Sequence, residues 1–360
     1  MVDGEQQGFI PILKSTLPLP EFWLSYLEIA YADSKFSNFG RLSHLVEERI
    51  ATLLGVSSDS IVTCVNATQA LTGAVSTAPE NEFQWTIPSW TFTATASAMV
   101  SANKDFFFSD VDLDWRVNPE RKDVNVVDVL PFGDGIDIQR LESLSDGEVV
   151  IDAAASFDAL RHSSLSSIKR RFGIVVSFHP TKFPAGPEGS VFITNDRGWA
   201  ERFRLWTIFG MDESRQSFFA GTNAKLNEFS SAVILASLDR YESSRREILA
   251  NLDIALDVSN KCNLDVNSAL SKGYASPYWI IKATNTRIQS IEREFSENSI
   301  STRRWWMYGC HQMPAYSKKP KSNLRETDTA AQTSLGLPMY SGMSRKEFER
   351  IEIALAKSKW

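Results

Sequence analysis

The sequence contains few of the residues that build metal sites and disulfide frameworks. Its 360 residues include three cysteines and four histidines. The cysteines, Cys64, Cys262 and Cys310, are too widely spaced for a metal-ligand motif or a disulfide framework, so we expect no metal site and a reducing compartment. No apolar run approaches the roughly 20 residues of a membrane span, and the acidic N-terminus lacks the basic and apolar blocks of a signal peptide. We therefore expect a cytoplasmic protein that does not contact membranes.

Phosphate-loop motifs and an excess of basic residues are also absent. Neither GxxxxGKS/T nor GxGxxG occurs, so the usual phosphate loops of NTP-binding and dinucleotide-binding proteins are missing. The net charge of −6 argues against nucleic acid as a partner. The length predicts about two domains, and a hydrophobic content of 43% is enough for a large core.

Short apolar segments alternate with helical patterns through the first two thirds of the chain. We expect strands at residues 61–65, 83–87, 106–108, 124–130, 148–151, 173–178 and 189–194. This alternation predicts an α/β domain, residues 1–245, with a mainly parallel seven-stranded sheet sandwiched by helices. Residues 246–360 are expected to form a smaller C-terminal α+β domain.

Polar side chains follow several of these expected strands. They are Asn66, Thr68, Asp152, Ser177 and Lys182. In open α/β sheets, residues beyond the carboxyl ends of the strands gather in one crevice, where ligands bind. Residues 66–71 also turn from a strand into a helix N-terminus, which is a geometry that holds phosphate. An Asn or Thr helix cap with no ligand would give the same pattern.

The strongest single signal is the apolar strand Val175–Phe178 that leads into a loop carrying Lys182. A lysine beside an apolar core loses its charge more easily and becomes a usable nucleophile and proton carrier. With Asp152 at the end of the preceding strand, Lys182 could bracket pyridoxal phosphate (PLP), which needs a lysine, a carboxylate and a phosphate cup. A structural Asp–Lys ion pair is the alternative, although it is costly when buried.

Seven segments, spread over most of the chain, match one set of motifs in the same order. They are Asn66-Ala-Thr-Gln-Ala-Leu71, Pro88-Ser-Trp-Thr-Phe-Thr-Ala-Thr95, Asp110-Val-Asp112, Asp152-Ala-Ala154, Ser177-Phe-His-Pro-Thr-Lys182, Gly221-Thr-Asn223 with Leu226–Ala232, and Leu337-Pro-Met-Tyr340. In this order they resemble the DegT/StrS family of PLP-dependent nucleotide-sugar aminotransferases. The resemblance implies fold type I of the aspartate aminotransferases, with PLP as cofactor and its pyridoxamine phosphate form during turnover.

The same resemblance implies roles for individual residues. Lys182 would form an imine with PLP and move the proton, Asp152 would pair with the ring nitrogen, and Phe92 would stack on the ring. Further contacts to the cofactor would come from Ala67, Thr68, Gln69, Ala155, Ser177, His179 and Asn223. Asn223 would reach the phosphate of a neighbouring subunit, which implies a homodimer with shared active sites.

Three positions depart from the family pattern. Ala155 stands where the family often has Gln, so the contact that Gln makes near the ring hydroxyl is either absent or replaced by another residue, for which Ser156 is the candidate. Lys225 stands where Arg is usual, which loses a bidentate grip on phosphate. Ile151 stands where an acid is often found. These departures indicate a divergent branch that keeps the central chemistry.

The segment Thr302-Arg-Arg-Trp-Trp306 is a candidate substrate contact. Arg303 and Arg304 could clamp a diphosphate, and Trp305 could stack on a base or sugar. Core tryptophans with solvated arginines are the alternative. The remaining residues that we expect to contact substrate are Trp90, Lys225 and His311.

The resemblance implies transfer of an amino group from L-glutamate to a nucleotide-linked keto-deoxysugar such as dTDP-4-keto-6-deoxyglucose. It would serve aminosugar, O-antigen or lipopolysaccharide biosynthesis. Phe178 and Phe183 stand where family members that act at C3 more often carry Tyr and Asn, so C4 amination is favoured over C3. Two alternatives are a PLP-dependent sugar dehydratase, which typically lacks the lysine, and a non-catalytic regulatory homologue. Lys182 and Asp152 argue against both.

Overall fold

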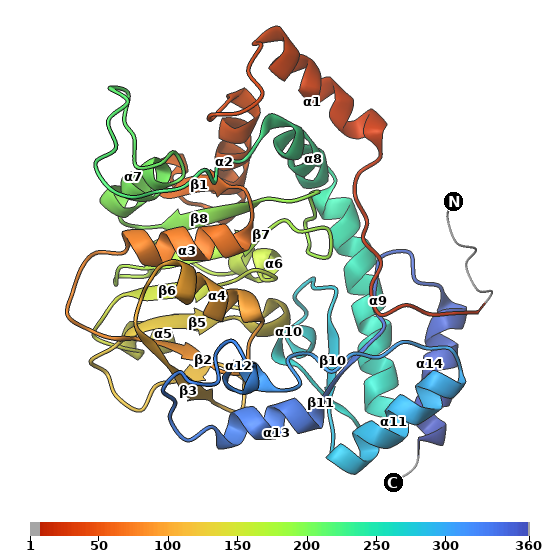
Figure 1. Cartoon of the computed structure of the whole chain (residues 1–360). Coiled ribbons are helices and arrows are strands. Elements are labelled where there is room, and N and C mark those ends of the chain that lie inside the picture. Colours follow the sequence, from red (N-terminus) through yellow and green to blue (C-terminus); the bar gives the residue numbers. More distant parts are fainter. Residues whose placement is uncertain (1–7, 359–360) are drawn as a thin grey trace.

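Eight strands between residues 61 and 194 form the central sheet (Figure 1), in a computed structural model that describes residues 8–358. The order of the strands is β1-β8-β7-β6-β5-β2-β3-β4. Their bounds are β1 (Ile61–Cys64), β2 (Trp85–Pro88), β3 (Phe106–Val111), β4 (Val117–Asn118), β5 (Asn125–Val129), β6 (Val149–Asp152), β7 (Gly173–Ser177) and β8 (Ser190–Thr194).

Five neighbouring strands, from β7 to β3, run parallel, whereas β8 is antiparallel to both β7 and β1. All seven strands expected from the sequence are present. The additional strand is the two-residue β4, which pairs with the end of β3. The prediction of an α/β protein with a mainly parallel sheet is therefore confirmed, with one more strand than expected.

Helices cover both faces of this sheet. Successive residues of a strand point to opposite sides, so each strand presents apolar side chains to both layers of helices. Val126 and Ile174 pack into one apolar cluster, and their neighbours Val127 and Val175 pack into another. The first face carries α2 (Arg41–Leu54), α5 (Ile138–Ser143), α6 (Phe157–Arg161) and α8 (Glu228–Asp239), and α1 (Pro20–Ala32) packs on α8. The second face carries α3 (Ala67–Thr77), α4 (Thr93–Ser101) and α7 (Arg197–Trp206). Short 3₁₀ turns occur at Ser58–Ser60, Pro131–Gly133 and Leu165–Ser167.

A second, smaller sheet follows the long helix α9 (Tyr241–Lys261) (Figure 1). Its antiparallel strands lie in the order β11 (Ser334–Leu337), β10 (Trp279–Lys282) and β9 (Asp265–Val266). The helices that follow α9 in the chain are α10 (Ser268–Ser271), α11 (Asn285–Glu297), α12 (Gly309–Gln312), α13 (Arg325–Thr333) and α14 (Arg345–Lys357), of which α12 packs with the core of the large sheet. Ser344 and Glu347 form the capping box expected at the start of α14.

The expected domain boundary, between residues 245 and 246, falls inside α9. Ile248 still packs with the core of the large sheet, whereas Leu252 packs with the core of the small sheet. The division into two domains therefore stays a prediction, and α9 is the element that joins the two cores.

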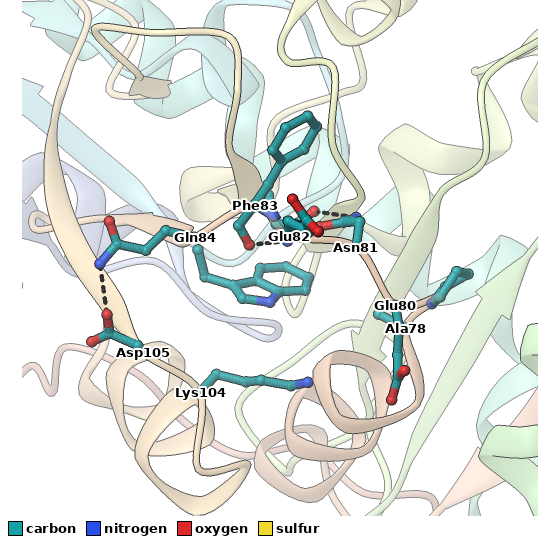
Figure 2. Close-up of a pocket in the computed structure, with 11 residues that line it drawn as sticks. Ala78, Glu80, Asn81, Glu82, Phe83, Gln84, Lys104 and Asp105 are labelled. Atoms are coloured by element: carbon teal, nitrogen blue, oxygen red, sulfur yellow. Dashed lines mark hydrogen bonds between the residues drawn. The ribbon is translucent and has the colours of Figure 1, made fainter.

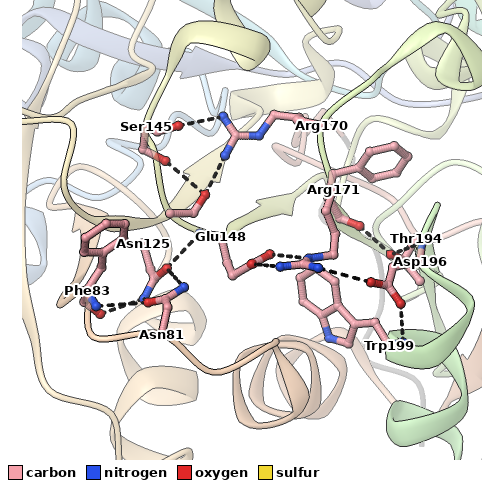
Figure 3. A network of polar contacts seen from close by, with 12 residues as sticks. Asn81, Phe83, Asn125, Ser145, Glu148, Arg170, Arg171, Thr194, Asp196 and Trp199 are labelled. Carbon is pink, nitrogen blue, oxygen red and sulfur yellow. Dashed lines mark hydrogen bonds and ion pairs between the residues drawn. The ribbon is translucent and has the colours of Figure 1, made fainter.

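A polar network fixes the edge of the large sheet where the parallel strands begin (Figure 3). Glu148, just before β6, pairs with Arg171, just before β7, and Arg171 also reaches Asp196 at 3.4 Å. Asn125 at the start of β5 accepts a hydrogen bond of 2.7 Å from the backbone of Glu148. This edge is tied by structural contacts, and the opposite edge is left to form a site.

Within residues 8–358, no helix is long and apolar enough to cross a membrane.

Candidate active site

A cavity of about 550 Å³ lies at the edge of the large sheet where the parallel strands end. The last residues of two adjacent strands, Asp152 of β6 and Ser177 of β7, line one side. Tyr278 and Arg303, which come from the region of the small sheet, line the other side. The volume is within the range of small-molecule sites, which is roughly 300–1,000 Å³. The strand ends therefore converge on a ligand-sized space, as the sequence predicts.

Lys182 enters this cavity from the loop that follows β7. Its backbone amide donates to the carbonyl of His179 at 2.8 Å, which closes a tight turn. Its Nζ donates to the hydroxyl oxygen of Tyr278, also at 2.8 Å. The amine is thus held at the junction between the two parts of the molecule.

Asp152 is a buried carboxylate with two hydrogen-bond donors. The hydroxyl of Thr95 donates to Oδ2 at 2.9 Å, and the amide of Ala154 donates to Oδ1 at 3.2 Å. Burial raises the pKa of Asp152, and these hydrogen bonds together with the charge of Lys182 offset the increase only in part. A cationic group in the cavity would stabilise the ionised form, and the protonated ring nitrogen of PLP is such a group.

The N-terminus of α3 forms a second wall of the cavity. Asn66 caps this helix, because its Oδ1 accepts the amide of Gln69 at 2.9 Å. Gln69 also lines the cavity, and the expected contact of its amide to phosphate stays a prediction. Ala67 and Thr68 precede it in the first turn and line the cavity, where the unpaired amides of a helix start attract anions.

Three further expected cofactor contacts also line the cavity. Phe92 stands just before α4 with an exposed ring, and His179 lies in the loop of Lys182, with Nδ1 2.9 Å from the hydroxyl of Thr181. Ala155 contributes only a methyl group. Ser156 does not compensate for it, because its hydroxyl is buried without a hydrogen-bond partner among the described residues.

Only one of the two expected arginines faces the cavity. Arg303 lines it together with Trp305, and its guanidinium lies 4.8 Å from the centre of that indole ring. Arg304 instead forms a paired contact with Glu292 of α11, at 2.7 and 2.8 Å. The expectation that both arginines meet substrate is therefore corrected, because the ion pair turns Arg304 away.

Trp90 and His311 also differ from expectation. Trp90 is fully buried against Trp115 and Trp306, with ring centres 4.6 and 4.8 Å away, so it supports the aromatic wall from behind. His311 is buried, and its Nδ1 lies 2.7 Å from the hydroxyl of Ser89. Burial lowers the pKa of this imidazole. Trp90 and His311 are therefore buried behind the residues that line the cavity, where they make packing and hydrogen-bond contacts.

Asn223 and Lys225 lie in the loop between α7 and α8, and the cavity of their own chain is lined by other residues. Lys225 Nζ donates to Asn223 Oδ1 at 2.5 Å. Partial burial lowers the pKa of Lys225. This placement is compatible with the expected contact to a second subunit, which a single chain does not test.

Comparison with known proteins identifies the architecture. A model of the DegT/DnrJ/EryC1/StrS aminotransferase family matches residues 22–356. The chain belongs to this family.

Individual members of the DegT/DnrJ/EryC1/StrS family give the same result. A dTDP-4-amino-4,6-dideoxy-D-glucose transaminase of Shigella dysenteriae is 26% identical over 255 residues, which cover 65% of this chain and 66% of that relative. A crystal structure of DesI in the presence of its TDP-sugar product has a TM-score of 0.84 at 24% identity, covering 97% of this chain and 92% of that one. NtdA of Bacillus subtilis, crystallised with bound pyridoxamine phosphate, has a TM-score of 0.84 at 17% identity and covers 99% of this chain and 86% of that one. Other relatives are named for position 3 of the sugar.

Family membership confirms the predictions of an aminotransferase and of PLP as cofactor. The likeness to the solved structures confirms the predicted fold. The residues present fit that cofactor. Lys182 offers an amine, Asp152 is a buried acid whose pKa is raised by burial, and the first turn of α3 lines the cavity. The roles of these residues stay predictions.

Two aromatic lining residues were missed in the sequence. Phe132 lies in the turn after β5 and stacks on Trp306 of the expected substrate segment, with ring centres 4.6 Å apart, and Tyr278 precedes β10. The position of Phe132 after a strand could have indicated its location. The sequence gives no such signal for Tyr278, because its place depends on how the small sheet packs on the large one.

A second hollow, of about 660 Å³, lies at the opposite edge of the large sheet (Figure 2). Its lining is polar and includes Glu80, Gln84, Lys104 and Asp105, with Gln84 donating to Asp105 at 2.8 Å. Every site residue expected from the sequence lies elsewhere. We therefore assign the chemistry to the cavity that holds Lys182.

Proposed function

We propose that this protein is a nucleotide-sugar aminotransferase that moves the amino group of L-glutamate to the keto carbon of a nucleotide-linked keto-deoxysugar. The observation that carries the proposal is one cavity with two chemically different ends. Lys182 and Asp152 lie at the end formed by the large sheet, and Arg303 and Trp305 lie at the other. A planar cofactor fits the first end, and a charged diphosphate fits the second.

At the cofactor end, each side chain has a separate task. PLP, when bound, supplies an acceptor for the amino group and for the electrons left behind when a proton leaves the substrate carbon. Lys182 would anchor it and carry that proton on Nζ, since its amine projects into the cavity. Asp152 would hold a proton on the ring nitrogen by its negative charge, and Thr95 keeps that carboxylate oriented.

At the substrate end, Arg303 offers a planar guanidinium to a diphosphate, and Trp305 offers an aromatic face to a base or sugar. The family relatives whose names specify dTDP- or TDP-linked sugars support this class of substrate. We favour C4 of a dTDP-linked 4-keto-6-deoxyhexose, because Phe178 and Phe183 depart from the pattern of the enzymes that act at C3. The cytoplasmic location and the role in O-antigen aminosugar synthesis stay parts of this proposal.

We further propose a homodimer whose active sites combine residues of both chains. Several aromatic side chains of the α1–α8 region and of the loop after α7 are exposed in the single chain, namely Phe36, Phe209, Phe218 and Phe229. Phe36 and Phe229 stack with ring centres 6.1 Å apart. Exposed apolar groups of this kind mark interaction surfaces, and Asn223 lies in the same loop as Phe218.

A direct assay tests the substrate class. Purified protein would be incubated with PLP, glutamate and a panel of dTDP-, UDP- and GDP-linked keto sugars, and each product would be identified by mass spectrometry and NMR. We expect an amine at C4 of a dTDP-linked deoxyhexose. Amination at C3 would correct the regiochemistry, and failure to aminate any nucleotide sugar would refute the proposed substrate class.

Two lysine variants belong to the same assay. Lys182→Ala protein should show neither the absorbance of lysine-bound PLP nor any turnover. Lys104→Ala, in the hollow at the other edge of the sheet, serves as the control and should behave like wild type. Full transaminase activity in the Lys182→Ala protein would exclude the assigned role.

A further inference from the structure

Tyr278 places a hydroxyl group against the amine of Lys182, although the two residues belong to different parts of the molecule. Lys182 follows β7 of the large sheet, and Tyr278 directly precedes β10 of the small sheet. The Nζ–Oη distance is 2.8 Å. Within residues 8–358, Nζ of Lys182 makes no other hydrogen bond.

The ring of Tyr278 is fixed by aromatic packing on the wall of the cavity. It lies 5.8 Å from the ring of Phe132 and 5.5 Å, edge to face, from Trp305. The side chain is 5% exposed. A tyrosine packed in this way loses little further rotamer freedom when its hydroxyl holds a partner, so the contact is preorganised.

The backbone around Tyr278 is anchored to the large sheet as well. The amide of Ala275 donates to the buried carboxylate of Asp158 at 2.7 Å, and the hydroxyl of Ser276 donates to the carbonyl of Phe132 at 2.7 Å. These two contacts fix the segment just before the tyrosine. The position of its hydroxyl is therefore set by both parts of the molecule.

Small residues allow the segment before Tyr278 to pack closely against the large sheet. A Cβ atom on Gly133 would lie 2.6 Å from Ser276 Oγ and 3.1 Å from the carbonyl oxygen of Ala155, so the three segments meet without space for a larger side chain. Ala155 itself brings only a methyl group to the cavity. The polar contact to Lys182 thus comes from the small-sheet side.

We propose that Tyr278 is a positioning residue for Lys182, which it holds by its hydroxyl so that the amine stays directed into the cavity. The inference rests on the proposed function of Lys182. No proton transfer to the phenol is required, because the hydroxyl oxygen accepts an N–H of the amine and orients it. Whatever moves the small sheet relative to the large one would also release this contact.

The test compares Tyr278→Phe, which keeps the ring and removes the hydroxyl, with Tyr274→Phe as a matched control in the same segment. The first readout is the pH titration of the absorbance of lysine-bound PLP, with no substrate present. Loss of the hydroxyl oxygen that accepts the N–H destabilises the protonated form of the nitrogen, so the midpoint should fall by about half a pH unit or more in Tyr278→Phe. The Tyr274→Phe midpoint should stay at the wild-type value.

The second readout is the split between kcat and KM. For Tyr278→Phe we expect kcat to fall about tenfold because the amine is less well oriented, with KM for the nucleotide sugar close to wild type. An unchanged midpoint together with an unchanged kcat would overturn the inference. A melting curve checks that the variant is folded. If it is not, a difluorinated tyrosine at position 278 replaces it, and a midpoint equal to wild type would again overturn the inference.

The outcomes separate this inference from the proposed function. A shifted midpoint in a protein that aminates no nucleotide sugar would support the role of Tyr278 and refute the proposed substrate class. Wild-type protein that forms no lysine-bound PLP at Lys182 would refute the assignment of Lys182 and this inference with it.

Discussion

Burial is what gives the carboxylate of Asp152 its chemical character. The side chain ends a strand that is buried along its whole length, so the ionised form loses hydration. The donors Thr95 and Ala154 recover part of that loss. A cation at the oxygens would recover more, which links the affinity for the cofactor to the stability of the protein.

The variant Asp152→Asn should therefore change thermal stability in opposite directions in the cofactor-free and the PLP-bound protein. Because the pKa is raised in the folded protein, the stabilisation by the neutral acid is complete below the ordinary pKa of 3.8 and is lost as pH rises through the folded pKa. At neutral pH, cofactor-free Asp152→Asn should melt at a higher temperature than wild type. PLP should stabilise it less than it stabilises wild type.

Turnover of Asp152→Asn should fall by about a thousandfold or more, by analogy with other orienting carboxylates. Calorimetry with and without PLP and steady-state rates provide the measurements. A variant with a rate within about threefold of wild type, a difference of under ~1 kcal/mol in barrier, would exclude the assigned role.

Arg303 and Arg304 are neighbours in sequence with different surroundings. Arg303→Ala should raise KM for the nucleotide sugar about tenfold or more and leave KM for glutamate nearly unchanged, because a charge-assisted contact to phosphate is lost. Arg304→Ala is the matched control, since its partner is Glu292. Steady-state kinetics with both substrates varied would test this, and equal KM changes in the two variants would contradict it.

At the scale of elements, Glu47 joins α2, β1 and α7. It lies on α2, accepts the amide of Thr63 in β1 at 2.8 Å, and pairs with Arg204 of α7 at 2.9 Å. Burial by itself would raise its pKa, but the contacts to His44, Arg204 and Thr63 outweigh burial and lower it. The charged form is therefore the one that holds these elements together.

Glu47→Gln should destabilise the protein by about 2 kcal/mol near neutral pH, because a buried arginine contact loses its charge. The lowered pKa means that the stabilisation is present above the ordinary pKa of 4.5 and is lost as pH falls through the folded pKa. The difference from wild type should thus shrink in acid. Urea unfolding at several pH values measures it, with the exposed neighbour Glu48→Gln as control. A difference independent of pH would contradict this account.

At the scale of the whole molecule, the proposed dimer makes a prediction that mixing can test. Lys182→Ala and Asn223→Ala subunits, each weak alone, should form hybrid dimers with one intact site. After random exchange, roughly a quarter of wild-type activity should return, since half of the dimers are hybrid and half of their sites are intact.

The control mixture combines Lys182→Ala with Asp152→Asn. Both residues line the cavity of one chain, so every hybrid site stays defective and no activity should return. Recovery equal to that of the first mixture, or an active monomer by light scattering, would refute shared sites.

The sequence by itself determined seven strands of the large sheet and the positions of Lys182 and Asp152 at its edge. Strands buried on both faces appear as short apolar runs, and polar residues beyond their ends must meet at one edge, so Lys182 and Asp152 could be placed from local pattern alone. The capping box at Ser344 could be identified for the same reason, because it depends on residues three apart.

Only the tertiary structure decided which side chains of the irregular segments face the cavity. Trp90 packs on Trp306 and Arg304 pairs with Glu292, and these contacts keep both side chains out of the cavity. Tyr278 reaches Lys182 because the small sheet packs against the turn at Phe132. These directions depend on partners that are distant in sequence, and no local propensity encodes a contact that exists only after both sheets have come together.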